Sequence, residues 1–316
     1  SGNLKTILAD FKAFKPTFIL AVPRIFEKIY NAASQKAGAG FKGRVFADAT
    51  QTAYDWSHAQ QSGGSIPLAL NAKHALYNKL VYSSIMEVFG GHVEYAVSGG
   101  APLDSSIAHF FNGVGLPLLE GYGMTETCAP SSVNPTEGYK IGTIGLPLQG
   151  VTMGVDEEGE LCIKSPAVCA GYHNNPDVTQ QQIVDGWLHT GDLGSIDDDG
   201  FVSIVGRKKD LIITAGGKNV SPCEMEASIM TSPVVSQCVM IGDRKPFIAA
   251  IISLDLAETN LWLESKGAEQ VADLDEASKN PIVRAEVERA VNKANELASR
   301  AESIRKFEIV PDEFTE

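Results

Sequence analysis

The sequence predicts an α/β protein in two parts: α/β sheet layers with a small β subdomain, and then a smaller α+β domain. Apolar strand patterns alternate with helical patterns in the first half, short strands and turns occupy about residues 145–209, and strands and helices alternate again over residues 210–316. A chain of 316 residues with 44% hydrophobic residues is also long enough to form two packed units. We therefore expect one domain over residues 1–209 and a second over residues 210–316.

The N-terminal region is expected to form a strand followed by a helical segment. Apolar residues between Pro16 and Pro23 predict a buried strand, and Pro23 occupies an early position of the next helix. Further apolar residues recur at helical spacing on either side of a turn at residues 62–67: Val45, Ala49, Ala53, Trp56, Tyr77, Val81, Ile85 and Val88. Packing in a core explains these residues without any ligand.

A strand, a glycine loop and a helix follow one another between residues 93 and 111. The strand is expected at residues 93–97, the loop is Ser98-Gly99-Gly100-Ala101-Pro102-Leu103, and Asp104 is expected to cap the helix. The small residues of the loop would let the backbone approach a ligand closely. Tight turns explain the same residues, but the pattern has the outline of half a nucleotide site.

The stretch Gly121-Tyr122-Gly123-Met124-Thr125-Glu126-Thr127 combines an aromatic face, hydroxyls and a carboxylate with two glycines. Apolar Leu116, Leu118 and Leu119 predict a buried strand before it, so we expect the motif where that strand runs out into a loop, the usual ligand position in an open α/β sheet. Tyr122 is suited to stacking on a purine, Thr125 to contacting a phosphate oxygen and Glu126 to binding Mg²⁺. Alternatively, Tyr122 is a buried core tyrosine, and Thr125 and Glu126 form a polar cap on the next segment.

The later elements include several turns and one amphipathic helix. A hairpin turn is expected at residues 197–200, a helix at about residues 221–230, and strands at residues 235–241 and 247–254. The late helix carries an apolar stripe of Val283, Val287, Ala290, Ala294 and Leu297. The glycine loop over residues 214–222 is either a hairpin end or a mobile loop that enters a site.

Four further residues carry polar or reactive groups. Asp192 is either a turn aspartate or the acceptor of both hydroxyls of a ribose, and Arg207 is either surface charge or a fork-shaped donor to ribose and phosphate oxygens. His189 lacks a partner at metal-ligand spacing, so we expect a structural histidine. Cys128 is expected to be a small buried thiol rather than a nucleophile.

Charge and cysteine content restrict the function. The net charge of -13 argues against a nucleic-acid surface, which needs clustered Lys and Arg; only residues 207–209 form a basic triplet. Five cysteines without a CxxC pair favour a reducing cytosol. No apolar run approaches the roughly 18 residues of a spanning helix, and no basic amphipathic helix indicates membrane binding. We expect a cytoplasmic protein with at most peripheral membrane contact.

Four motifs in this order resemble those of the adenylate-forming superfamily of acyl-CoA synthetases, luciferases and peptide-synthetase adenylation domains. They are residues 98–103, 121–127, 187–193 and 206–212, and the resemblance covers nearly the whole chain. Residues 22–29 and the helical insertion are similar specifically to the long-chain fatty acyl-CoA ligases, because short-chain relatives usually lack that insertion.

The resemblance implies ATP-dependent ligation of a long-chain fatty acid to coenzyme A. In this family the fatty carboxylate attacks the α-phosphate of ATP and releases pyrophosphate, with Mg²⁺ as cofactor, and the thiol of coenzyme A then displaces AMP. A small C-terminal lid domain swings about a hinge between the two steps, so that one site serves both.

The resemblance also assigns roles to individual residues. Gly99, Gly100, Ala101, Tyr122 and Gly123 would hold adenine, Thr125 the α-phosphate, Glu126 the Mg²⁺ ion, and Asp192 and Arg207 the ribose. Lys209 or Asp210 would be the hinge, and the loop of Gly216, Gly217 and Lys218 would shape the coenzyme A channel. Catalytic roles would fall to Thr125, Glu126 and Lys209.

Two family features are missing from the sequence. The Ser/Thr/Gly-rich phosphate loop with its Lys is absent, and the chain stops just before the position of the family's adenylation Lys. We therefore expect a fragment without the N-terminal part and the extreme C-terminus, which leaves the second domain incomplete and acyl-adenylate formation slow. Two alternatives are an enzyme that loads a carrier protein instead of coenzyme A and a non-catalytic acyl-nucleotide sensor.

Overall fold

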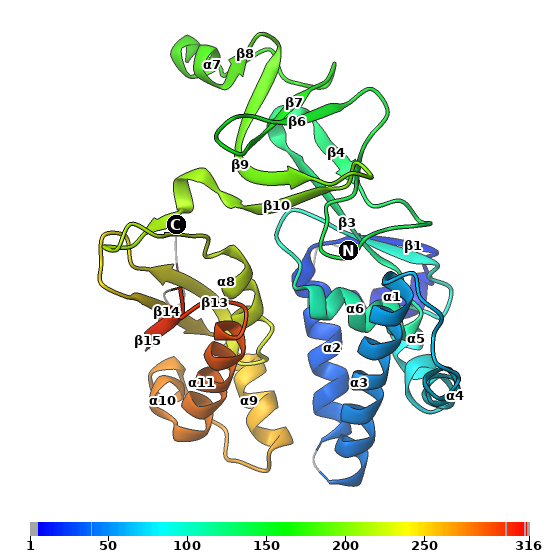
Figure 1. Cartoon of the computed structure of the whole chain (residues 1–316). Coiled ribbons are helices and arrows are strands. Elements are labelled where there is room, and N and C mark those ends of the chain that lie inside the picture. Colours follow the sequence, from blue (N-terminus) through cyan, green and yellow to red (C-terminus); the bar gives the residue numbers. More distant parts are fainter. Residues whose placement is uncertain (1–5, 39, 301, 313, 315–316) are drawn as a thin grey trace. The chain divides into compact units, whose positions relative to one another are not determined.

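The computed structural model of the chain describes residues 6–38, 40–300, 302–312 and 314. The chain divides into two compact units, one made of Ser1–Ile29 and Val45–Lys208 and the other of Tyr30–Arg44 and Lys209–Glu316. Each unit has its own sheets and helices (Figure 1). Among the described residues, no helix combines the length and the apolar character needed to cross a membrane.

The first unit contains a mixed five-stranded sheet in the order β1-β2-β3-β4-β5. Its strands are β1 (Phe18–Ala21), β2 (Tyr95–Ser98), β3 (Leu118–Met124), β4 (Ala129–Val133) and β5 (Leu146–Pro147). The first three pair in parallel, whereas β3 with β4 and β4 with β5 pair antiparallel. Because parallel strands end at the same edge of a sheet, the loop after β2 and the second half of β3 lie close together.

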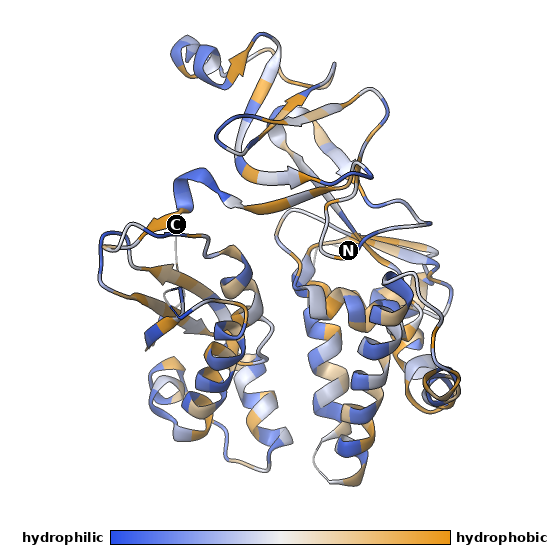
Figure 2. Ribbon diagram, viewed as in Figure 1, coloured by the Kyte–Doolittle hydropathy of each residue, from blue (hydrophilic) through white to orange (hydrophobic). Residues whose placement is uncertain are grey.

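Helices of the first unit supply aromatic residues to its core. They are α1 (Ile7–Phe14), α2 (Pro23–Ala37, which continues into the second unit's residues), α3 (Phe41–Gln61, which begins in the second unit's residues), α4 (Leu68–Tyr77), α5 (Ser83–Val88) and α6 (Ser105–Val114), with a π-helical turn at Asn78–Tyr82. The carboxylate of Asp104 caps α6 as predicted, because it accepts the backbone N–H of Ser106 at 2.8 Å. Strand β1 is hydrophobic throughout, whereas α2 and α3 alternate in hydropathy (Figure 2).

The predicted β subdomain is an antiparallel sheet in the order β10-β9-β7-β6. Its elements are β6 (Thr152–Val155), β7 (Glu160–Lys164), α7 (Pro176–Gln182), β8 (Ile183–Val184), β9 (Trp187–Ile196) and β10 (Val202–Arg207). The predicted hairpin turn is present, since Asp197 accepts the backbone N–H groups of Asp199 and Phe201 at 3.0 and 2.9 Å. A small cluster of apolar side chains fills its interior: Ile144, Met153, Leu161, Ile163 and Val202.

The second unit packs helices on a three-stranded sheet. The sheet contains β13 (Val235–Ile241), β14 (Ile248–Leu254) and β15 (Ile304–Val310), and β11 (Ile212–Ile213) forms a separate hairpin with β12 (Asn219–Val220). The helices are α8 (Cys223–Met230), α9 (Leu256–Ser265), α10 (Leu274–Lys279) and α11 (Pro281–Asn295). Helix α11 begins where Asn280 caps it and Pro281 takes the first helical position.

Three sequence predictions about buried residues were wrong. Strand β1 is not buried, because it lies at the end of the sheet's strand order and exposes Phe18 (46%) and Leu20 (69%). Leu297 lies beyond the end of α11 and is 60% exposed, because the helix stops at Asn295, whereas the other four residues of the stripe are buried. Cys128 is exposed rather than buried, because it follows a short 3₁₀ turn in the left-handed conformation with φ 55°.

Candidate nucleotide site

Three residues predicted for the site meet at one carboxylate of the first unit. Asp192 on β9 lies directly opposite Arg207 on β10 in the antiparallel register, and the Nε of Arg207 donates to Asp192 Oδ1 at 3.1 Å. The hydroxyl of Tyr122 on β3 donates to Asp192 Oδ2 at 2.5 Å. Asp192 is only 4% exposed, so its charge depends on these two donors. Both bonds are charge-assisted and therefore fix the carboxylate firmly.

The phenol of Tyr122 is held in its protonated, donating form. Burial, followed by the bond to Asp192, raises the pKa of Tyr122 above its ordinary value. Tyr122 also packs against the apolar cluster of the β subdomain. Asp192 can still accept further hydrogen bonds, since each carboxylate oxygen has two lone pairs and each accepts only one of these donors.

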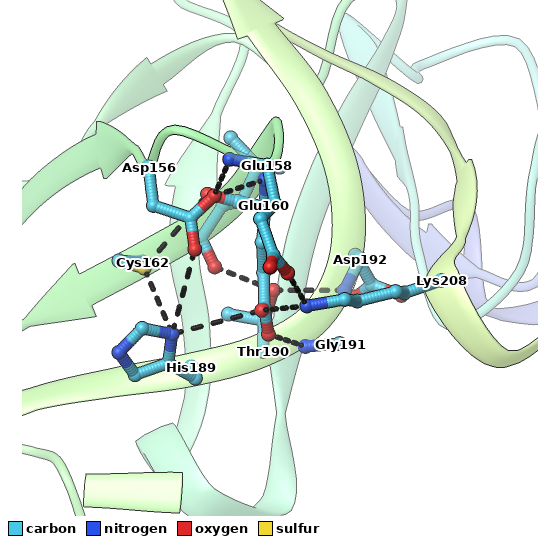
Figure 3. Close-up of polar contacts among 10 residues, drawn as sticks. Asp156, Glu158, Glu160, Cys162, His189, Thr190, Gly191, Asp192 and Lys208 are labelled. Atoms are coloured by element: carbon cyan, nitrogen blue, oxygen red, sulfur yellow. Dashed lines mark hydrogen bonds and ion pairs between the residues drawn. The ribbon is translucent and has the colours of Figure 1, made fainter. Parts of the chain in front are cut away.

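The backbone around Asp192 is positioned by a buried carboxylate that sequence reasoning missed. The N–H of Gly191, whose φ is 75°, donates to Glu160 Oε1 at 2.7 Å (Figure 3). Thr190 Oγ1 donates to the carbonyl of Leu161 at 2.7 Å and accepts the N–H of Asp192 at 3.1 Å. Glu160 lies on β7 and is 6% exposed. Its one signal in the sequence is an acidic residue at the start of an apolar strand.

The predicted glycine loop follows β2 and lies beside β3. A Cβ on Gly99 would lie 3.2 Å from the carbonyl oxygen of Gly121, and Gly100 has a φ of +82°. The N–H of Gly99 donates to the carbonyl of Ala21 at the end of β1, at 3.3 Å. Gly100 and Ala101 are exposed. The loop thus presents open backbone at the carboxyl ends of β1 and β2, beside the middle of β3.

The sequence had predicted that the motif of residues 121–127 lies in a loop after the strand, and this prediction was wrong for its first half. Strand β3 continues to Met124, because Gly121–Met124 pair antiparallel with β4. Gly123 permits this pairing, since a Cβ there would overlap the carbonyl group of Ala129. Only Thr125–Thr127 form a turn, a short 3₁₀ helix on which Thr125 is exposed.

Glu126 is held by a second tyrosine that sequence reasoning missed. The hydroxyl of Tyr172 donates to Glu126 Oε1 at 2.9 Å, and burial together with this carboxylate raises the pKa of Tyr172 to about 12. Within the described part of the chain, Glu126 Oε2 takes part in no hydrogen bond or ion pair. A half-exposed carboxylate with one free oxygen, next to the exposed hydroxyl of Thr125, fits the one or two protein ligands that Mg²⁺ takes beside a phosphate.

The predicted hinge and coenzyme A loop belong to the second unit. Lys209 and Asp210 are exposed within the 3₁₀ turn Lys208–Asp210. Gly216 and Gly217 are exposed in the β11–β12 hairpin, which is closed by a bond from the Thr214 N–H to the carbonyl of Lys218 at 3.0 Å.

The ammonium of Lys218 pairs with Glu302 Oε1 at 3.0 Å. This pairing, after a bond from Ser299, lowers the pKa of Glu302 to about 2. Lys218 is therefore anchored at the end of an otherwise exposed loop.

The fold and the site define this chain as a member of a known enzyme family. The model of the AMP-binding enzyme family matches residues 2–173, and the model of the AMP-binding enzyme C-terminal domain matches residues 209–315. The chain therefore belongs to the AMP-binding enzyme family, and the resemblance to adenylate-forming enzymes is confirmed.

Among curated proteins, the chain is similar to the long-chain-fatty-acid–CoA ligase FadD15 of Mycobacterium tuberculosis. The two are 44% identical over 316 residues, which is 100% of this chain and 52% of the relative. The long-chain-fatty-acid–CoA ligase ACSBG2 of Gallus gallus is 30% identical over 98% of this chain and 44% of its own length. The chain spans about half the length of the curated relatives it matches.

A solved structure confirms the predicted α/β fold class. The adenylation domain of a carboxylate reductase from Mycobacterium chelonae superposes with a TM-score of 0.67 at 22% identity, over 100% of this chain and 44% of that one.

Proposed function

We propose that this chain carries the nucleotide-binding region and the lid domain of an enzyme that ligates a long-chain fatty acid to coenzyme A. The reaction consumes ATP, passes through an acyl-adenylate and releases AMP and pyrophosphate. The observation that supports it best is the convergence of Tyr122, Asp192 and Arg207 in an AMP-binding enzyme. The 44% identity to a long-chain-fatty-acid–CoA ligase supports the substrate class.

In this proposal, Asp192 binds the ribose of the nucleotide. Its free lone pairs accept both ribose hydroxyls, while Tyr122 and Arg207 hold the carboxylate in place. The side chain of Arg207 is 58% exposed, so donors not bound to Asp192 remain for a ribose or phosphate oxygen. The backbone of Gly99–Ala101, exposed at Gly100 and Ala101, and the partly buried ring of Tyr122 accommodate adenine, with Gly123 beside them.

Thr125 and Glu126 are proposed to bind the phosphate end. The hydroxyl of Thr125 donates to an α-phosphate oxygen, and Glu126 Oε2 helps to hold Mg²⁺. When bound, the ion neutralises charge that develops on the phosphate oxygens. Tyr172 keeps Glu126 oriented through Oε1 and leaves Oε2 free for the ion.

The second half-reaction is assigned to residues of the second unit. Lys209 and Asp210 are proposed as the hinge, with Lys209 as a catalytic group, and Gly216, Gly217 and Lys218 as the loop beside the pantetheine arm of coenzyme A. Two adjacent glycines leave the backbone free to lie against a thin ligand. The five cysteines are all free, which supports a reducing compartment such as the cytoplasm.

Nucleotide binding by the 316-residue chain tests the first part of this proposal. Calorimetric titration with AMP should give one site in the wild type. Asp192→Asn should weaken binding at least tenfold, because it replaces charge-assisted bonds of about 1.5–3 kcal/mol. The control Asp177→Asn removes an exposed carboxylate on α7 and should leave affinity within twofold. If the wild type and Asp192→Asn bind AMP with equal affinity, the proposal that Asp192 binds the ribose is contradicted.

Product analysis tests the activity itself. The protein is expressed from the whole reading frame that encodes this chain and incubated with ATP, Mg²⁺, coenzyme A and a mixture of short to long fatty acids. Mass spectrometry should detect long-chain acyl-CoA. Acyl-AMP that persists in the presence of coenzyme A would instead indicate transfer to a carrier protein, and the absence of any acylated product would contradict the ligase proposal.

A further inference from the structure

Three potential metal ligands converge on one side of the β subdomain, near but separate from the proposed nucleotide contacts. Cys162 lies on β7, His189 on β9, and Asp156 directly after β6 (Figure 3). One ligand atom from each lies within 4.8 Å of those of the other two. His189 Nδ1 is 3.5 Å from Cys162 Sγ and 3.8 Å from Asp156 Oδ2.

These separations are close to those that a bound zinc ion imposes. Zn–S bonds of about 2.3 Å and Zn–N or Zn–O bonds of about 2.0–2.2 Å at tetrahedral angles place S and N about 3.6 Å apart and N and O about 3.4 Å apart. The observed 3.5 and 3.8 Å differ from these values by a few tenths of an ångström, and the Asp156 carboxylate and Cys162 Sγ lie within 4.8 Å of each other, so side-chain rotations would close the site. A sulfur, an imidazole nitrogen and a carboxylate oxygen are also the ligand types that Zn²⁺ takes together.

The neighbouring hydrogen bonds leave the three ligand atoms pointing inward. Asp156 Oδ1 accepts the backbone N–H groups of Glu158 and Glu160 at 2.8 and 2.9 Å, which fixes the carboxylate and turns Oδ2 toward His189. Cys162 is 7% exposed, and its thiol donates only weakly, to the carbonyl of Glu160 at 3.8 Å. Fixed carboxylates that orient a site before the ion arrives are typical of metal centres.

The local charge also favours a cation. Asp156, Glu158 and Glu160 carry three carboxylates, and the only ammonium that pairs with any of them in the described chain is that of Lys208, which binds Glu158 and Glu160. Glu160 Oε2 lies 3.6 Å from His189 Nδ1 but already accepts from Lys208 at 3.2 Å, so it contributes charge rather than a fourth bond. Divalent binding would offset this excess of negative charge.

We propose that Asp156, Cys162 and His189 bind one Zn²⁺ ion, with a water molecule as fourth ligand. On binding, the Cys162 thiol releases its proton to solvent and coordinates as the thiolate. The ion joins β7 to β9, the strands that carry Glu160 and Asp192, and so stabilises the β subdomain. This proposal is independent of the ligase function.

Titration of the metal-free 316-residue chain with Co²⁺, a spectroscopic substitute for Zn²⁺, tests the site. One equivalent should bind with a thiolate-to-cobalt absorption band, and Zn²⁺ should displace it with a Kd on the order of 1 µM or tighter. Cys162→Ser should abolish the band, and His189→Gln should weaken binding at least tenfold. The matched control Cys223→Ser, in the second unit, should bind like the wild type.

Thermal unfolding provides a second measurement that does not depend on a thiolate band. At the same Zn²⁺ concentration, the Tm of the wild type and of Cys223→Ser should rise by several degrees, and that of His189→Gln should rise clearly less, because its weaker binding stabilises the folded state less. If the wild type binds no Co²⁺ or Zn²⁺ stoichiometrically, or if Cys162→Ser binds as the wild type does, the proposal is overturned. The wild-type titration decides this even if a variant fails to fold.

Discussion

Two sides of the proposed nucleotide site, both in the first unit, are held in different ways. The side at the ends of β2 and β3 is held by close backbone contacts, in which Gly99 faces the carbonyl of Gly121 and Gly123 faces that of Ala129. The side on β9 and β10 is held by side chains around Asp192. The first side therefore depends on the absence of side chains, and the second on specific hydrogen-bonding groups.

The largest effect is expected on the side held by backbone contacts. Gly123→Ala should lower the free energy of unfolding by about 3 kcal/mol, because the new methyl group would overlap the backbone of β4 and force the two strands apart. Urea unfolding followed by tryptophan fluorescence measures this. Gly64→Ala is the control, since its Cβ would meet nothing closer than Ser62 Oγ at 3.9 Å, and it should change stability by less than about 0.5 kcal/mol. Similar values for both variants would contradict this account of β3.

The same side contains a carboxyl group that the fold keeps neutral. Burial raises the pKa of Glu120 on β3 to about 8, although backbone N–H groups of Leu103 and Gly142 oppose the shift. Because the folded pKa is above the unfolded value of 4.5, the stability that Glu120 contributes is full below pH 4.5 and is lost as the pH rises through 8.

Glu120→Gln should remove this loss of stability at high pH, because glutamine does not ionise. At pH 8 the variant should be more stable than the wild type by about 3 kcal/mol, and the difference should shrink toward pH 5. Urea unfolding at both pH values measures this difference in the free energy of unfolding. The control is Glu94→Gln, which changes an exposed glutamate just before β2 and should show no such difference. A difference that does not depend on pH would show that Glu120 is ionised throughout.

The side held by hydrogen bonds should respond to Glu160→Ala. This change leaves the N–H of Gly191 without its partner and removes one of the two carboxylates that pair with Lys208, so unfolding should become easier by about 1–2 kcal/mol and AMP should bind about tenfold more weakly. Glu160→Gln keeps an oxygen for Gly191 and should restore most of the AMP affinity. If both variants bind AMP as the wild type does, Glu160 has no role in positioning Asp192.

The sequence predicted best those features that depend on neighbouring residues. The cap by Asp104, the turn at Asp197 and strand β13 at residues 235–241 all follow from local patterns and are present. The apolar stripe of α11 was predicted except for Leu297, because no sequence signal marks the end of the helix at Asn295.

Features that depend on distant pairing could not be predicted. Strand β3 extends through Tyr122 only because β4 pairs with it, and β15 was not predicted because three helices separate it in the sequence from its parallel partner β14. Likewise, the bonds from Tyr172 to Glu126 and from Gly191 to Glu160 join residues from separate segments. Periodicity within one segment contains no information about such partners.

The ion pairs of Lys208 have a mechanical consequence for the chain. Lys208 is the last residue of the first unit, and its ammonium is tied to Glu160 and Glu158 on and beside β7. The proposed hinge at Lys209 therefore begins directly after a residue whose side chain is paired to groups on and beside β7. In this proposal, the ion pairs of Lys208 hold the end of β10, where Arg207 lies opposite Asp192, while the backbone rotates at the hinge.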